Sequence, residues 1–186
     1  MSKIILTFGI LAGLINVVIA TLLTNFAGDE MMHANSEWVG YLVMIIALSM
    51  IFVGVKQYRD NYLGGVIKFG KAFLVGLYIA LVASAFYVGG WEIYLQTSDV
   101  NFMETYSTSV IENMEADGAS DVAIAEMEEQ IQFYSDMYEN PFFRVLLTLS
   151  EILPVGLIIS LVSAALLRKS TFMPTEENMN PDASAI

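Results

Sequence analysis

The sequence has no cysteine and a single histidine, His33, among its 186 residues. The absence of cysteine excludes disulfides, thiol nucleophiles, iron–sulfur clusters and thiolate zinc sites. One histidine in a short polar segment is a weak signal for a metal ligand, so we predict no metal site and no cofactor. The sequence also lacks HExxH, a glycine-rich phosphate loop and a serine–histidine or serine–lysine pair within its hydrophobic runs. It therefore predicts a protein that is not an enzyme.

Basic residues are also scarce, with 8 lysines and arginines against 20 acidic residues and a net charge of −12. Hydrophobic residues make up 56% of the chain and gather in long runs, and the mean hydropathy is +0.60. This composition is typical of proteins that cross a lipid bilayer several times. We therefore predict an all-α integral membrane protein with four transmembrane helices, whose surroundings are lipid and which has no nucleic-acid partner.

The hydrophobic runs and the charged segments between them divide the chain into eight parts. These are a first transmembrane helix at 1–27, an outward loop at 28–37, a second transmembrane helix at 38–55, a basic cytoplasmic loop at 56–71, a third transmembrane helix at 72–95, an acidic extracytoplasmic helical hairpin at 96–141, a fourth transmembrane helix at 142–167 and a cytoplasmic tail at 168–186. In the first helix, Gly9 and Gly13 either permit close approach of a neighbouring helix or reflect the general frequency of glycine in membrane helices.

The segment 96–141 contains no lysine or arginine, yet its apolar residues recur at helical spacing. Asp117 to Ser120 offers a turn between two such helices, with Ser120 as a candidate N-cap. We therefore expect an antiparallel helical hairpin outside the membrane. Its charges indicate either a docking surface or, more simply, a solvated acidic face.

The basic residues indicate how the chain is oriented. With four spans, seven of the eight fall on one side, namely Lys3, Lys56, Arg59, Lys68, Lys71, Arg168 and Lys169. The positive-inside rule then places both termini in the cytoplasm of a bacterium and the hairpin outside its inner membrane. Lys56, Arg59, Lys68 and Lys71 either bind anionic lipid headgroups or act only as a topology signal.

Polar residues within the spans are candidates for a functional site. Glu151 lies in the fourth span, where a carboxylate facing lipid is costly, so we expect protein to enclose it. Pro154 frees the carbonyl of Ser150 and is expected to kink the helix. Together with Asn16, Thr148 and Ser150, Glu151 is predicted either to bind a proton or cation or, as a protonated acid, to bond a neighbouring helix.

A second polar pair is expected at the outward ends of the third and fourth spans. Glu92 and Arg144 both lie there, and an ion pair between them would clamp the two helices together. By contrast, Arg144 and Glu151 are two helical turns apart, about 10 Å along the axis, which is too far for a direct contact.

Several segments of the chain resemble a family of bacterial membrane proteins catalogued as domain of unknown function 4199. The resemblance is carried by Lys56 to Asp60, Gly64 and Gly65, Phe69 to Ala72, Asn140 to Arg144, Glu151 to Gly156 and Ser160 to Ala164. It extends from the first span to the end of the fourth. It implies an inner-membrane location and no particular activity.

Two functions follow from these observations. The first is a non-enzymatic scaffold or accessory subunit that docks a partner through the acidic hairpin, as a homo-oligomer or within a larger membrane complex. The alternative is a small oligomeric transporter or channel in which Glu151 is a proton or cation site. Inverted repeats of the kind found in transporters are not visible in the sequence.

Overall fold

The computed structural model describes residues 1–26, 28–97 and 101–174, apart from the side chains of residues 24–37. Within these residues all regular structure is helical. The helices are α1 (Ser2–Phe26), α2 (Gly28–Leu48), α3 (Met50–Leu63), α4 (Phe69–Thr97), α5 (Phe102–Ala116), α6 (Asp121–Glu139) and α7 (Pro141–Leu167).

Four helical segments are long and apolar enough to cross a membrane. They are Ser2–Leu23, Trp38–Leu63, Phe69–Thr97 and Pro141–Leu167. The second combines the end of α2 with α3, because Ser49 between them keeps helical dihedral angles, φ −57° and ψ −21°. Helices suit this setting since they satisfy their backbone hydrogen bonds internally, where no water is present to do so. The prediction of an all-helical chain with four membrane-type helices is confirmed.

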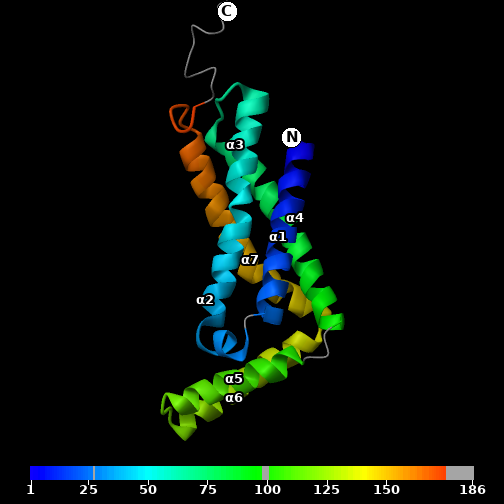
Figure 1. The fold of residues 1–186 in the computed structure, drawn as a ribbon, viewed down its shortest axis with the longest axis vertical. Coiled ribbons are helices and arrows are strands. Elements are labelled where there is room, and N and C mark those ends of the chain that lie inside the picture. Colours follow the sequence, from blue (N-terminus) through cyan, green and yellow to red (C-terminus); the bar gives the residue numbers. More distant parts are fainter. Residues whose placement is uncertain (27, 98–100, 175–186) are drawn as a thin grey trace, which may run out of the picture.

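Helix α4 is the central element of the bundle. It packs against α1, α3 and α7, and α1 also contacts α2 and α3. The N-terminus, the end of α3 and the end of α7 lie at one end of the bundle, and α5 and α6 lie across the other end (Figure 1). We call these the basic end and the hairpin end. The core between them is formed by buried apolar residues such as Phe8, Ile51, Val75, Ile79 and Leu167.

The contact between α1 and α4 depends on glycine. A Cβ atom added to Gly9 would lie 2.5 Å from the Cβ of Val82, and one added to Gly13 would lie 2.3 Å from the Cβ of Phe86. Both distances are shorter than any side-chain contact permits. Of the two interpretations of this glycine pair, the structure favours close helix approach.

Small residues also line the contact between α4 and α7. A Cβ on Gly76 would lie 3.0 Å from the Oγ of Ser160, and a Cβ on Gly156 would lie 2.9 Å from the Cβ of Ala80. Ser160 is fully buried, and its hydroxyl donates to the carbonyl of Gly156 at 2.7 Å. This polar group is therefore satisfied by its own helix, and the two backbones can approach closely.

Two segments differ from their expected structure. Residues 28–37, expected to form a loop, are the first part of α2. The side chain of His33 is not among those that the structure describes. The second span does not stop at Val55 but continues to Leu63, since the sequence offers no helix breaker before Gly64, which has φ +62°. Lys56 and Arg59 therefore lie on a helix rather than in a loop.

Helices α5 and α6 lie side by side at the hairpin end (Figure 1). The N-cap Asn101 accepts a hydrogen bond from the backbone of Glu104 at the start of α5. Ser120 caps α6 in the same way by accepting from the backbone of Ala123. Between the two helices, Gly118 adopts φ +76°, a conformation that glycine tolerates at little cost. The turn and the cap lie where the sequence predicted them.

We predict that Gly13→Ala lowers the stability of the bundle by about 1–3 kcal/mol, the usual cost of overpacking a close contact. The new methyl group would meet the Cβ of Phe86, which cannot move without moving the backbone of α4. Gly89→Ala is the matched control, because no atom lies within 4 Å of its added Cβ. Thermal unfolding in detergent measures both, and equal midpoints for the two variants would contradict the contact.

Candidate functional site

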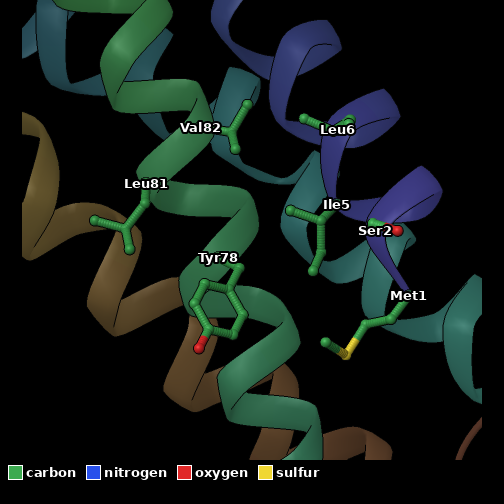
Figure 2. A pocket seen from close by; sticks show the side chains of 7 residues that line it. All are labelled: Met1, Ser2, Ile5, Leu6, Tyr78, Leu81 and Val82. Atoms are coloured by element: carbon green, nitrogen blue, oxygen red, sulfur yellow. The ribbon is translucent and has the colours of Figure 1, made fainter.

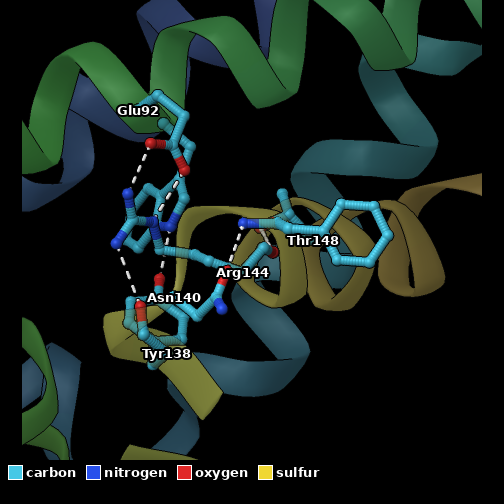
Figure 3. A network of polar contacts seen from close by, with 7 residues as sticks. Glu92, Tyr138, Asn140, Arg144 and Thr148 are labelled. Atoms are coloured by element: carbon cyan, nitrogen blue, oxygen red, sulfur yellow. Dashed lines mark hydrogen bonds and ion pairs between the residues drawn. The ribbon is translucent and has the colours of Figure 1, made fainter. Parts of the chain in front are cut away.

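The hairpin is attached to the bundle by a polar junction centred on Arg144. Asn140 is the N-cap of α7 and accepts from the backbone of Phe142 at 3.0 Å, and Pro141 occupies the first helical turn, a position that suits its missing N–H. The side chain of Arg144 is thereby placed one turn inside α7, opposite Glu92 on α4 (Figure 3). Because Asn140 and Pro141 define where α7 begins, they also determine the position of Arg144 in the junction.

Arg144 and Glu92 form a two-pronged ion pair. The Nε of Arg144 donates to Oε1 of Glu92 at 2.7 Å, and its Nη2 donates to Oε2 at 2.6 Å. The Nη1 of Arg144 donates to the backbone carbonyl of Tyr138 at 2.9 Å. The parallel geometry matches a planar guanidinium to a carboxylate, the strongest form of such a pair. One side chain therefore joins α4, the end of α6 and the start of α7.

Aromatic side chains surround this ion pair. The ring of Trp91 lies edge-to-face against Phe102, with centroids 5.0 Å apart, and Phe102 stacks on Tyr138 at 5.6 Å. The indole N–H of Trp91 donates to the hydroxyl of Tyr138. Burial raises the pKa of Tyr138 to about 12, so its hydroxyl is protonated at neutral pH. The aromatic contacts fix the base of the hairpin on the end of α4.

A small cavity lies at the junction. Its volume is about 190 Å³, and its lining includes Phe102, Ser135, Tyr138 and Arg144. Sites for small organic ligands usually measure about 300–1,000 Å³. The guanidinium of Arg144, one of the lining residues, is already bonded to Glu92 and to the backbone of Tyr138. The junction is therefore better suited to attach the hairpin to the bundle than to bind a small ligand.

Within the described chain, no hydrogen bond joins the four residues predicted to form an intramembrane polar site. Thr148 is buried and donates to the carbonyl of Arg144 at 3.0 Å, while Ser150 is exposed and donates to the carbonyl of Leu147 at 2.6 Å. Asn16 is buried on α1, which packs against α2, α3 and α4, and its Nδ2 has no hydrogen-bond partner. Each hydroxyl thus bonds its own helix.

Glu151 departs most clearly from expectation. We expected protein to enclose it, but the structure places it on the exposed surface of the single chain. The reason is its register, since α7 turns Thr148, Ile152 and Gly156 toward the bundle and Glu151 lies about 100° away from Ile152 around the helix. Helix α7 continues through Pro154 without interruption; the kink remains a prediction.

The basic end also differs from the predicted lipid-headgroup cluster. Arg59 is fully buried, so it is not available to lipid. Its Nε donates to Asp60 at 2.6 Å, and its Nη1 and Nη2 donate to the carbonyls of Phe172 and Met173 at 2.9 and 2.6 Å. Lys56 is also engaged, at 2.6 Å from Asp60. Burial of a charge requires such partners, and here residues after α7, predicted to form a tail, supply two of them.

Lys68 and Lys71 remain exposed, as a headgroup site would require. The Nζ of Lys71 lies 6.0 Å from the centre of the Tyr58 ring. Of the four basic residues predicted to bind lipid headgroups, Lys68 and Lys71 are therefore the two that have the exposure such binding requires.

The tail residue Phe172 packs on Phe52 with ring centres 6.4 Å apart. This apolar side chain in a polar tail was the available sequence signal that the segment after α7 is ordered.

The fold and the junction define an all-helical protein with four membrane-type helices and a helical pair fixed across one end of the bundle. Residues 7–169 match the model of the family described as Protein of unknown function (DUF4199). The chain belongs to this family, as its resemblance predicted. No curated protein and no solved structure matches it.

We predict that Glu92→Gln and Arg144→Gln each lower stability by about 2 kcal/mol, because each leaves a partly buried charge without its partner. The double variant is expected to lose little more than the worse single variant, since both remove the same interaction. Thermal unfolding measures the cycle, with Glu112→Gln on the exposed face of α5 as the control. Strictly additive losses would show that the pair contributes nothing.

Proposed function

We propose that this protein is a non-enzymatic membrane scaffold or accessory subunit that docks a partner protein through the α5–α6 hairpin. The observation that carries the proposal is the exposure of the hairpin. None of the described residues of α5 is buried, and in α6 only Ile131 is. A helical pair that buries so few of its residues leaves its outer surface available for another molecule.

The surface chemistry of the hairpin supports a protein partner. Val122 and Phe133 are 69% and 62% exposed on α6, and the ring of Phe133 lies edge-to-face with that of Tyr134 at 5.9 Å. Exposed aromatic residues are typical anchors of protein interfaces. Around them the segment carries only acidic charge, from Glu104 to Glu139, with no lysine or arginine. The partner surface that fits is therefore basic, with an apolar pocket at its centre.

The attachment of the hairpin supports the same function. The bidentate Arg144–Glu92 pair and the Trp91–Phe102–Tyr138 contacts hold the base of α5 and α6 on the bundle. A rigid base presents the outer side chains in one orientation, which lowers the entropic cost of binding. The alternative, an oligomeric transporter or channel, requires a neighbouring copy to enclose Glu151 and remains a prediction from the sequence.

We further propose that the protein lies in a bacterial inner membrane with both termini in the cytoplasm. All seven basic residues of the predicted cytoplasmic side belong to the basic end of the bundle, opposite the hairpin. This asymmetry is the one that the positive-inside rule describes.

The orientation is measured with single cysteines, since the natural chain has none. We expect a membrane-impermeant maleimide to label Glu128→Cys on α6 in intact spheroplasts and to label Ser170→Cys only after lysis. Both residues are exposed, so accessibility alone does not separate them. The opposite labelling pattern would reverse the proposed topology.

Docking is tested by crosslinking in native membranes followed by affinity purification of the chain. We expect one partner to be recovered in constant ratio, to be lost with Phe133→Ser, and to dissociate as salt rises, because its contact is partly electrostatic. Leu157→Ser is the control, since Leu157 is exposed on α7 and far along the chain from the hairpin. An assembly of unchanged size and composition after Phe133→Ser and after replacement of residues 102–139 by a short linker would refute the proposal.

A further inference from the structure

A groove of about 400 Å³ lies between α1 and α4 near the basic end (Figure 2). It lies next to the close contact between these helices. At Gly9 and Gly13 the two helices are close together, and the groove begins one turn nearer the N-terminus, at Ile5 and Leu6, where α1 carries larger side chains. The lining includes Met1, which precedes α1, Ile5 and Leu6 from α1, and Tyr78, Leu81 and Val82 from α4.

The position of the groove determines what kind of molecule can enter it. It lies within two of the helices that are long and apolar enough to span a membrane. Its side chains are almost all apolar, and Leu6, Tyr78 and Leu81 are exposed on the outside of the chain. In a bilayer this surface meets hydrocarbon rather than water. A flexible alkyl chain fits an open apolar channel of this volume, which falls in the range of small-ligand sites.

Two lysines belong to the segments that form the groove, on the side of the basic end. Lys3 follows the lining residues Met1 and Ser2 on α1, and Lys71 precedes Tyr78 by seven residues, two turns along the same face of α4. The only carboxylate at this end among the described residues is Asp60, and it is bonded to Lys56 and Arg59. No salt bridge engages Lys3 or Lys71 within the described chain.

We propose that the α1–α4 groove binds one acyl chain of an anionic phospholipid, whose phosphate group meets Lys3 and Lys71. The apolar walls hold the alkyl chain, and the two ammonium groups select an anionic headgroup over a zwitterionic one. The site depends on the chain being a membrane protein and is independent of the docking function of the hairpin. In this site Lys3 and Lys71 bind the headgroup, whereas Arg59 and Lys56, which were predicted to do so, are bonded to Asp60.

The test uses phosphatidylglycerol with a diazirine in its acyl chain, incorporated at low abundance into phosphatidylcholine nanodiscs that hold the intact protein. After irradiation, peptide mass spectrometry maps the crosslinks. We expect them to concentrate on residues 1–6 and 78–82 and to be displaced at least fivefold more efficiently by unlabelled phosphatidylglycerol than by phosphatidylcholine. Lys3→Gln with Lys71→Gln should abolish this headgroup preference while leaving the fold intact.

A second variant tests the groove itself. Leu81→Trp adds bulk to its wall and should reduce crosslinking there severalfold, whereas Leu161→Trp, at a similarly exposed leucine on α7, should leave it unchanged. Crosslinks spread evenly over all lipid-facing helices would overturn the proposal. So would equal losses in both tryptophan variants, or a native mass of two chains with the groove protected from the probe, which would assign it to a second copy.

Discussion

Close packing of α1 and α7 against two sides of α4 is the interaction on which the rest of the structure depends. Between membrane helices the hydrophobic effect gives little attraction, because lipid tails are as apolar as the side chains, and contact energy must come from close backbone approach. Gly9 and Gly13 provide it on one side of α4, and Gly76 and Gly156 on the other. Larger residues at these positions would separate the helices and remove the dispersion contacts between them.

The same packing determines where the hairpin is held. Because α4 and α7 lie together along their length, the last turns of α4 bring Glu92 opposite the first turn of α7, where Arg144 is located. The chain leaves the bundle after Thr97 and returns at Pro141. The hairpin is thus attached at both of its ends within one cluster of polar and aromatic contacts. Its outer surface is free, while its base shares the stability of the bundle.

Sequence reasoning predicted the features that depend on local patterns. Long apolar runs predicted the four membrane-type helices, and the Ser120 cap and Gly118 turn follow from local backbone chemistry. The Glu92–Arg144 contact could be predicted as well, because two opposite charges at adjoining ends of two neighbouring helices have few other partners. Features of this kind need only helix geometry and the order of the segments.

Features that depend on helix rotation or on distant segments were not predictable. Whether Glu151 faced the bundle or the outside depended on the rotation of α7, which is set by the row of Thr148, Ile152 and Gly156 along its length. The second span was assigned too short because its final turns are polar, although no residue before Gly64 ends the helix. The burial of Arg59 required backbone carbonyls from the tail, and a carbonyl carries no side-chain signal in a sequence.

The partners of Arg59 also impose an order on the maturation of the molecule. Its guanidinium is bonded to the carbonyls of residues 113 and 114 positions later in the chain. At ribosomal rates of roughly 5–20 residues per second, these carbonyls emerge about 6–23 seconds after Arg59 itself. During that interval the arginine must stay hydrated at the membrane surface, since burial without acceptors would be strongly unfavourable. The basic end of the bundle therefore closes last, after the residues that follow α7 have been synthesised.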